Sequence, residues 1–282
     1  MPALPSSSVQ AARRAVADRL REIRREANLT ATDVAGRTGW YKSKVSRLEN
    51  AVTPPSDDDI RAWCRACRAD GMVADLIAAS RSADTMYVEW RRLQRTGLRR
   101  LQDSYIPLFE RTRTFRIYCS NVVPGLLQTG GYAAALLGAI AAFRGTPDDV
   151  TAAVAARLDR SRIIGRGDRR LALLVEEAVL RHRVGGADVM AGQLGHLLSV
   201  MAYPSVSLGV IPFSAERRMW MIETFSAYDT DQVQVETLTA QLNVTAPSEV
   251  EQYLRAFGEF SKLAVHGAAA RTLITSAIDA LG

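Results

Sequence analysis

Cationic and hydroxyl side chains gather in one short segment of this 282-residue chain, residues 39–50. The chain contains three lysines against thirty-three arginines, and two of these lysines, Lys42 and Lys44, stand shortly before Arg47 in this segment. Ammonium and guanidinium groups donate hydrogen bonds to phosphate oxygens and to the O6 and N7 atoms of guanine. The segment therefore has the chemistry of a nucleic-acid contact, although a solvated basic helix face is an equal alternative from these residues alone.

A helix over this segment would separate its polar side chains from an apolar pair. Positions 42, 43, 46 and 47 share one face of such a helix, whereas Val45 and Leu48 share another. We expect the apolar pair to anchor the helix inward while the cations and hydroxyls point outward.

The preceding residues predict two further helices. Apolar side chains recur at spacings of three and four over residues 13–27, which predicts a first helix. Thr30 and Asp33 form a short capping box for a second helix, and Gly39 permits the tight turn that ends it. Short helices, a glycine-containing turn and a polar-faced third helix are the plan of a helix-turn-helix domain.

A fourth helix is predicted after the Thr-Pro-Pro stretch at residues 53–55, which cannot continue a helix. Ser56 and the three carboxylates of residues 57–59 provide a strong N-terminus. Cys64 and Cys67 have CxxC spacing but lie on the apolar stripe of this helix, and no second pair completes a metal site. We interpret both as core residues rather than zinc ligands or a redox pair.

The same residues carry a family resemblance. Over about residues 13 to 80 the chain resembles the XRE-type (phage repressor and Cro-like) helix-turn-helix domain, through Leu20-Arg21-Glu22-Ile23-Arg24, Leu29-Thr30, Val34-Ala35, Gly39, Val45-Ser46-Arg47-Leu48-Glu49-Asn50 and Pro54. In that family the start of the third helix enters the major groove. The resemblance implies the base-facing residues Tyr41, Lys42, Ser43, Lys44 and Arg47, with Thr32 and Ser46 as phosphate contacts.

The resemblance also implies structural roles. Arg24 and Glu49 match a buried ion pair that braces the first helix against the third. Ala51 stands where the family usually has Gly, so we expect Asn50 or a different turn to adopt any left-handed conformation. Ala31 replaces the family's usual Gln at the start of the second helix, which removes one DNA contact.

Length and composition set the wider organisation. At 282 residues and 48% hydrophobic the chain is expected to form two domains. Residues 1–120 carry 22 Lys and Arg against 14 Asp and Glu, whereas residues 121–282 carry 14 against 16, so the basic excess is N-terminal. No run is long and apolar enough for a membrane span, and the odd number of cysteines, three, favours a reducing cytoplasm.

We predict four segments: a disordered arm at residues 1–12, the helix-turn-helix domain at 13–82, a linking helix at 83–112 and a regulatory domain at 113–282. Alternating and periodic apolar patterns in the last segment predict several strands among helices. The expected fold class is an all-α helix-turn-helix domain plus an α+β domain with an antiparallel or mixed sheet.

The second domain resembles a known but uncharacterised one. Its ordered motifs over roughly residues 85 to 275 resemble the C-terminal domain that follows such helix-turn-helix heads in actinobacterial antitoxin-like transcriptional regulators. The motifs are Val123-Pro124-Gly125-Leu126-Leu127-Gln128-Thr129, Tyr132-Ala133, Glu177-Ala178-Val179-Leu180-Arg181, Val184-Gly185-Gly186, Gln193-Leu194 and Ile211-Pro212-Phe213. The resemblance implies regulation and a possible protein partner, and no catalytic residues.

Chemistry-bearing residues in the second domain are few. Glu176, Glu177 and His182 lack any recognised ligand spacing, so we interpret them as helix-start carboxylates and a surface histidine. The aromatic residues Trp220, Phe225 and Tyr228 line either a ligand pocket or the core, with the core more common.

The sequence therefore predicts a cytoplasmic, non-enzymatic transcriptional regulator without metal or cofactor. It binds a pseudo-palindromic operator in double-stranded DNA, and we expect a homodimer because one short recognition helix specifies too few base pairs. Two alternatives remain for the second domain: an antitoxin-like module that binds a small partner protein, and a sensor of a small-molecule effector.

Overall fold

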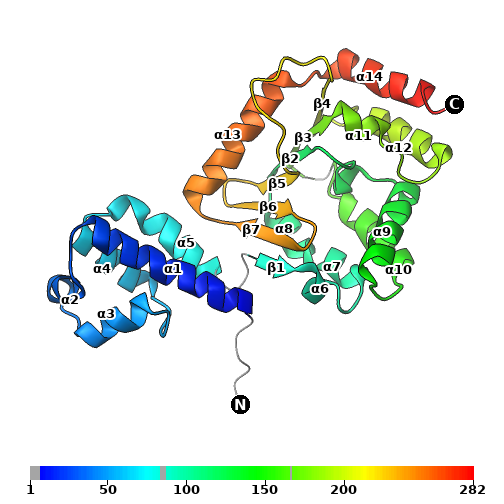
Figure 1. Ribbon diagram of the computed structural model, residues 1–282. Coiled ribbons are helices and arrows are strands. Elements are labelled where there is room, and N and C mark those ends of the chain that lie inside the picture. The colour runs from blue at the N-terminus through cyan, green and yellow to red at the C-terminus, as the bar shows by residue number, and fades with distance from the viewer. Residues whose placement is uncertain (1–6, 83–86, 166) are drawn as a thin grey trace. The chain divides into compact units, whose positions relative to one another are not determined.

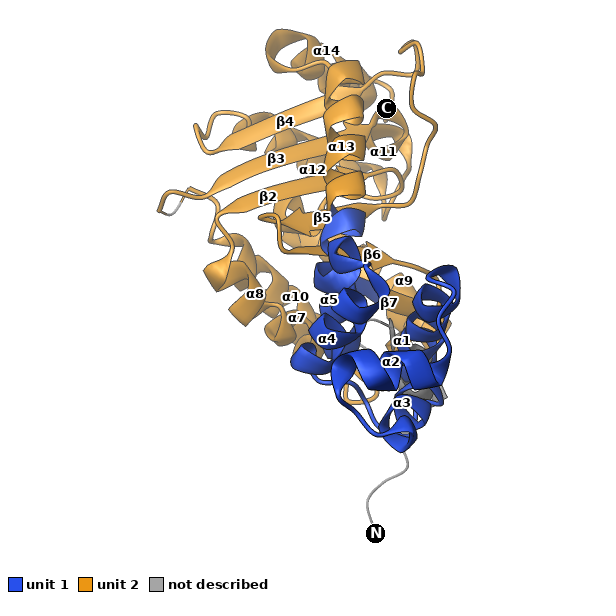
Figure 2. Ribbon diagram, turned by 90° about the vertical axis from the view of Figure 1, so that its left-hand side faces the viewer, with its two compact units in different colours: residues 1–88, 242–250 blue, residues 89–241, 251–282 orange. Residues whose placement is uncertain are grey.

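The computed structural model describes residues 7–82, 87–165 and 167–282 (Figure 1). The chain divides into two compact units, coloured separately in Figure 2. The first unit, called the head here, comprises residues 1–88 and 242–250. The second unit, called the body, comprises residues 89–241 and 251–282.

The head is helical, as predicted, and its helices are α1 (Ser7–Glu26), α2 (Ala31–Thr38), α3 (Lys42–Glu49), α4 (Asp57–Cys67) and α5 (Val73–Ser82). Trp63 of α4 is fully buried, and its indole Nε1 donates a hydrogen bond to the Leu20 carbonyl of α1 at 3.0 Å. Around it lie the side chains that the periodicity predicted to be buried, among them Leu20, Ile23, Val34, Val45, Leu48, Ile60 and Cys64.

The first helix is longer than the sequence pattern predicted. It begins at Ser7, so residues 7–12 are helical instead of belonging to a disordered arm, and residues 1–6 lie outside the described residues. The physical reason is that residues 9–12, Val-Gln-Ala-Ala, contain no helix breaker and continue the good helix formers that follow.

The expected single linking helix over residues 83–112 is corrected by the structure. Residues 83–86 lie outside the described residues, and after them come the short strand β1 (Tyr87–Glu89) and the helices α6 (Trp90–Leu93), α7 (Leu98–Ser104) and α8 (Ile106–Arg111). Gly97 breaks the helix with a φ of 102°. The Asp149 carboxylate then accepts hydrogen bonds from the Leu98 and Arg99 amides at 2.8 and 2.9 Å, which caps α7 as a new helix.

Most of the predicted mixed sheet lies in the body. Its strands are β2 (Thr114–Cys119), β3 (Arg170–Glu176), β4 (Val206–Ile211), β5 (Phe225–Tyr228), β6 (Gln232–Glu236) and β7 (Ala240–Val244), and among the described residues the order is β1-β7-β6-β5-β2-β3-β4. Strand β3 runs parallel to both β2 and β4, whereas β5 runs antiparallel to β2 and β6. Figure 2 shows β2, β3 and β4 side by side. Strand β7 was not predicted, although its sequence Ala-Gln-Leu-Asn-Val alternates apolar and polar side chains as a strand does.

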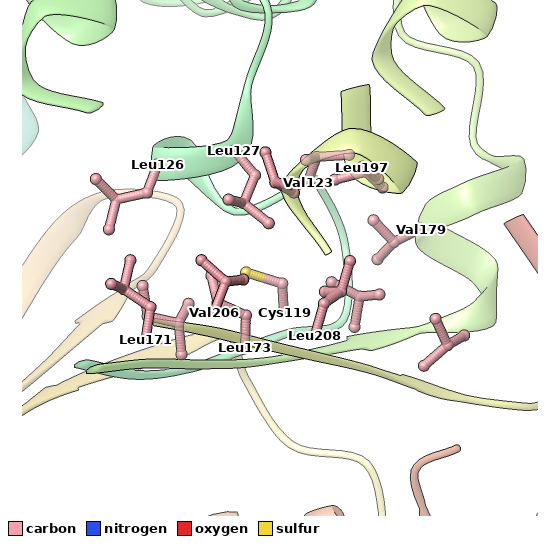
Figure 3. Close-up of a cluster of buried hydrophobic side chains, with 14 of the residues drawn as sticks. Cys119, Val123, Leu126, Leu127, Leu171, Leu173, Val179, Leu197, Val206 and Leu208 are labelled. Carbon is pink, nitrogen blue, oxygen red and sulfur yellow. The ribbon is translucent and has the colours of Figure 1, made fainter. Parts of the chain in front are cut away.

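Helices cover both faces of this sheet, namely α9 (Gly130–Arg144), α10 (Val150–Ser161), α11 (Glu177–Arg181), α12 (Ala187–Val200), α13 (Pro247–Leu263) and α14 (Gly267–Asp279). On one face Cys119, Leu173 and Leu208 of the parallel strands pack towards Leu127, Val179 and Leu197 (Figure 3). On the other face the Tyr118 ring stacks on Phe260 of α13, with ring centroids 4.1 Å apart. Successive side chains of β2 therefore pack into two separate cores, one on each face of the sheet, as expected for a strand between two layers of helices.

Candidate nucleic-acid interface

Helix α3 is fixed in the head by its apolar face. Val45 and Leu48 are 0% and 2% exposed. The turn before the helix begins at Gly39, whose φ of 72° lies in the left-handed region and whose amide donates to the Ala35 carbonyl. Glycine adopts this conformation without the steric cost that a Cβ brings. The sequence therefore fixes both the angle at which the chain enters α3 and the face that the helix buries.

The opposite face of α3 presents polar side chains to solvent. Tyr41, at the N-cap position, is 85% exposed, and Lys42, Ser43 and Arg47 are exposed as well. Within the described residues, no hydrogen bond or ion pair engages the Lys42 ammonium or the Arg47 guanidinium. These groups are free to donate to a ligand, which is what base-edge contacts require.

Lys44, which is also expected to face the bases, has partners within the head. Its ammonium donates to the Asp59 carboxylate of α4 at 2.6 Å and lies 4.2 Å from the centroid of the Trp40 ring. Although burial raises the pKa of Asp59, the hydrogen bonds from Lys44 and Ser56 together bring it below its ordinary value. Lys44 therefore ties α3 to α4 in this structure, and its charge is already paired.

The two residues expected to contact phosphate differ in their surroundings. Thr32 is exposed in the first turn of α2. Ser46 is also exposed, but the Asn50 side-chain amide donates to its carbonyl at 2.8 Å and to its hydroxyl oxygen at 3.3 Å. The Ser46 hydroxyl still has its proton to donate, so a phosphate oxygen remains a suitable partner for it.

The Arg24 and Glu49 side chains lie against each other between α1 and α3. The Arg24 Nε and Nη2 atoms donate to the two carboxylate oxygens of Glu49 at 2.5 and 3.1 Å. Arg21 was not predicted to take part, yet its Nη2 donates to the Glu49 carbonyl at 2.5 Å and to the Asn50 side chain at 3.1 Å. The signal in the sequence was the three-residue spacing of Arg21 and Arg24, which places both on one face of α1.

The turn after α3 uses Ala51 rather than Asn50. Ala51 has a φ of 53°, whereas Asn50 has a φ of −103°. The expectation that Asn50 or a different turn would adopt any left-handed conformation is thus corrected. The Asn50 side chain forms hydrogen bonds with Ser46 and Arg21.

The three aromatic residues proposed for a ligand pocket, Trp220, Phe225 and Tyr228, lie at two different places in the body. Phe225 and Tyr228 of β5 are buried and line one cavity of the body. Trp220 is 73% exposed and lies instead beside a groove between its loop and α13. The aromatic residues therefore do not form one site.

The carboxylates Glu176 and Glu177 are more deeply buried than helix-start residues usually are. Glu176 is 2% exposed, pairs with both terminal nitrogens of Arg217 and accepts from the Tyr118 hydroxyl at 2.8 Å. Glu177 pairs with Arg181 at 3.0 Å and accepts from the Phe213 amide at 2.9 Å. Their oxygens hold the loop after β4, and this use of both carboxylates is structural.

The head has the short helices and the glycine-containing turn of a helix-turn-helix domain. Residues 15–76 match the family model described as a helix-turn-helix domain. Residues 103–276 match the model described as a domain of unknown function, DUF5753. This match covers more than half of the chain, and the protein belongs to that family.

Two further comparisons add little. No curated protein matches the chain. One solved structure, that of TrmBL2, an archaeal chromatin protein described as showing a novel mode of DNA binding, matches with 10% identity and a TM-score of 0.31, over 85% of this chain and 88% of that one. A likeness of this size establishes neither the fold nor the function of this chain. In the described residues, no helix has the length and apolar character needed to cross a membrane.

Proposed function

We propose that this protein is a cytoplasmic, non-enzymatic regulator of transcription that recognises a specific DNA sequence through α3. The observation that carries the proposal is the division of α3 into two faces. Val45, Leu48 and Glu49 are locked into the head, and the exposed row of Tyr41, Lys42, Ser43 and Arg47 has hydrogen-bonding groups without a described partner. A rigid helix that displays unsatisfied donors is what reading the major groove requires.

The test is to select a preferred sequence from random duplex DNA with the full chain and then to measure binding of single-base variants. Arg47→Ala is expected to abolish the preference at one or two base pairs, at a cost of about 1–3 kcal/mol, because a bidentate arginine contact discriminates guanine by that amount. Arg25→Ala is the matched control, since Arg25 is an exposed arginine of α1. An unchanged preference for Arg47→Ala would exclude this face of α3 as the reading surface.

The proposal includes a homodimer whose body supplies the contact between chains and receives a regulatory signal. A single short helix reads too few base pairs to find one site in a genome, and paired heads read half-sites about 34 Å apart or a multiple of that distance. Light scattering of the full chain, with and without the selected DNA, measures the stoichiometry. A selected sequence with one half-site and a 1:1 complex would contradict the dimer.

One observation favours a second candidate for the body, the binding of a small partner protein. Phe213, Trp220 and Met221, all in the loop between β4 and β5, are 63%, 73% and 54% exposed. Exposed aromatic residues that are close in sequence are typical of protein interfaces. If this candidate holds, a protein that co-purifies in equal amount with the full chain is lost from Trp220→Ser and retained by Tyr203→Ser, a control at another exposed aromatic residue.

A further inference from the structure

A cavity of about 310 Å³ lies within the body, between the strands β2, β5 and β6 and the helices α7 to α10. This volume is at the lower end of the range of ligand pockets, about 300–1,000 Å³. Its described wall carries three arginines, Arg144, Arg157 and Arg160, against one carboxylate, Glu236. The wall of the cavity is therefore cationic.

The two arginines of α10 have only neutral hydrogen-bond acceptors. The Arg157 Nε and Nη1 atoms donate to the side-chain oxygens of Gln102 and Gln128, at 3.1 and 2.5 Å. The Arg160 Nη1 atom donates to the Gln102 carbonyl at 3.4 Å. Within the described part of the chain, no carboxylate forms an ion pair with Arg157 or Arg160. Buried charges are normally paired, because removal from water carries a large cost that only a counter-charge offsets.

Aromatic rings hold two of the guanidinium groups in place. The Arg160 Cζ atom lies 4.8 Å from the ring centroid of Tyr105 and 4.8 Å from that of Phe109. The Arg144 Cζ atom lies 4.6 Å from the Trp90 ring centroid. Stacking on a ring fixes the plane of a guanidinium and leaves its edge, which carries the N–H donors, available to a ligand.

Both arginines of α10 remain cations at neutral pH. Burial, together with the neighbouring charge of Arg160, lowers the pKa of Arg157 to about 10, and burial also lowers the pKa of Arg160. The two positive charges are three residues apart on one helix and repel each other. This arrangement is unfavourable in the protein alone and becomes favourable once an anion lies between the two groups.

Two buried atoms on the cavity wall have no hydrogen-bond partner within the described residues, Arg160 Nε and Gln94 Oε1. Arg160 is 9% exposed and Gln94 is 3% exposed. A buried donor and a buried acceptor without partners on the wall of one cavity are costly in the absence of a ligand, and together they define what a ligand must offer. The ligand must accept a hydrogen bond from Arg160 Nε and donate one to Gln94 Oε1.

We propose that this cavity binds a small organic anion whose carboxylate or phosphate group is held by Arg157 and Arg160. A hydroxyl or amine of the same molecule donates to Gln94, and its apolar part lies against the aromatic rings and the apolar wall. Polymers such as nucleic acid or polypeptide are too large for a cavity of this volume. The further assignment of this anion as the regulatory signal rests on the proposed function, whereas the binding site itself does not.

The test measures binding to the full chain in the absence of DNA, so that its failure is distinct from failure of the DNA-binding proposal. The probe is 3-hydroxybenzoate, titrated by calorimetry, with 3-hydroxybenzyl alcohol as its uncharged counterpart and inorganic phosphate as the bare anion. We expect one site per chain and binding of the carboxylate at least about tenfold tighter than that of the alcohol, the ratio that one charge-assisted hydrogen bond provides.

Variants then locate the site. Arg160→Gln is expected to weaken binding of the probe about tenfold or more, whereas Arg162→Gln is expected to leave it unchanged, because the Arg162 side chain is 68% exposed and pairs with Asp159 on the same helix. If Arg160→Gln fails to fold, a crystal of the unaltered protein soaked with 3-bromobenzoate gives the position of the bromine directly.

Each outcome decides the proposal. Arg160-dependent binding of the benzoate supports the proposal, whereas Arg160-dependent binding of phosphate alone would overturn the organic anion and leave only a site for free oxyanions. Absence of binding by both anions at millimolar concentration, an equal affinity for the alcohol, or a bromine outside this cavity would overturn it.

Discussion

Ala51 adopts a backbone conformation that residues with a Cβ rarely take. Its φ of 53° lies in the left-handed region, where an alanine costs roughly 1–2 kcal/mol. Ala51→Gly removes this cost but increases the entropy of the unfolded chain, so we expect a net gain of about 0.5–1 kcal/mol in the free energy of unfolding. Urea denaturation measures this change in the free energy of unfolding. Ala62→Gly, within α4, is the control and is expected to lose about 1 kcal/mol.

The pairing of Arg24 with Glu49 predicts a second effect at the scale of residues. Arg24→Ala leaves the Glu49 carboxylate, with a side chain 9% exposed, next to Arg21 alone at 3.8 Å. We expect a loss of about 2–3 kcal/mol in the free energy of unfolding, somewhat less than for a fully buried pair. Arg25→Ala, at an exposed neighbour on α1, is expected to change it by less than about 0.5 kcal/mol. Equal effects of the two substitutions would refute the structural role of Arg24.

Individual residues differed in how far their surroundings were predictable. The exposed position of Arg47 and the buried position of Val45 follow from helical periodicity, which is a local property of the sequence. The pairing of Lys44 with Asp59 depends on how α4 packs against α3, and periodicity within α3 carries no information about that. The cationic wall of the body was missed for a related reason. Arg157 and Arg160 lie four and seven residues after the fully buried Ala153, and this spacing was the available signal.

At the scale of elements, two capping boxes begin helices of the head. In α2 the Thr30 hydroxyl accepts from the Asp33 amide and the Asp33 carboxylate accepts from the Thr30 amide, and Ser56 and Asp59 repeat the arrangement in α4. The sequence predicted both starts, the first from the three-residue spacing of Thr30 and Asp33 and the second from Ser56 and the carboxylates that follow it. It did not predict the division of residues 83–112 into short helices, because the cap on Leu98 comes from Asp149, which is distant in sequence.

These caps predict how the stability of the head depends on pH. Hydrogen bonds from Thr30 lower the pKa of Asp33, and in Asp59 the hydrogen bonds from Lys44 and Ser56 outweigh burial and lower its pKa too. A lowered pKa stabilises the folded state above the ordinary value of 3.8, and that contribution is lost as the pH falls through the folded-state pKa. We expect the free energy of unfolding to fall on acidification below about pH 4.

Asp59→Asn tests the assignment. The variant is expected to be less stable than the unaltered protein at pH 7 and to lose less on acidification, because the titrating group is absent. Asp58→Asn, at a side chain 93% exposed in the same turn of α4, is the control and is expected to keep the full pH dependence. Urea denaturation monitored by Trp63 fluorescence gives both curves, and identical slopes for the two variants would contradict the role of Asp59.

At the scale of the whole molecule, the basic excess of residues 1–120 predicts a strong salt dependence of DNA binding. Contacts between Lys or Arg and phosphate release counterions, so the logarithm of the association constant falls linearly with the logarithm of the salt concentration, by about 0.9 for each phosphate contacted. Fluorescence anisotropy from 50 to 200 mM salt measures the slope. We expect a steep negative slope, and a slope near zero would contradict binding through contacts between Lys or Arg and phosphate.

The overall architecture was predictable only in outline. The first four helices of the head and the mixed α+β character of the body follow from the patterns of apolar residues, whereas α5 was not predicted. The strand order does not, because β2 lies between β3 and β5, and each of these neighbours is separated from it by a long stretch of chain. Pairing between strands that are distant in sequence depends on tertiary packing, about which the local pattern of apolar residues carries no information.

The membership of residues 242–250 in the head has a consequence for engineering this chain. The head is not formed by one continuous segment, because residues 89–241 of the body come between its two parts in the sequence. A fragment ending at residue 88 lacks the Ser248 amide that donates to the Asp75 side chain at 3.1 Å. A chimaera that takes its DNA specificity from a relative must therefore replace two segments of this chain. One is the helical part of the head, and the other is residues 242–250.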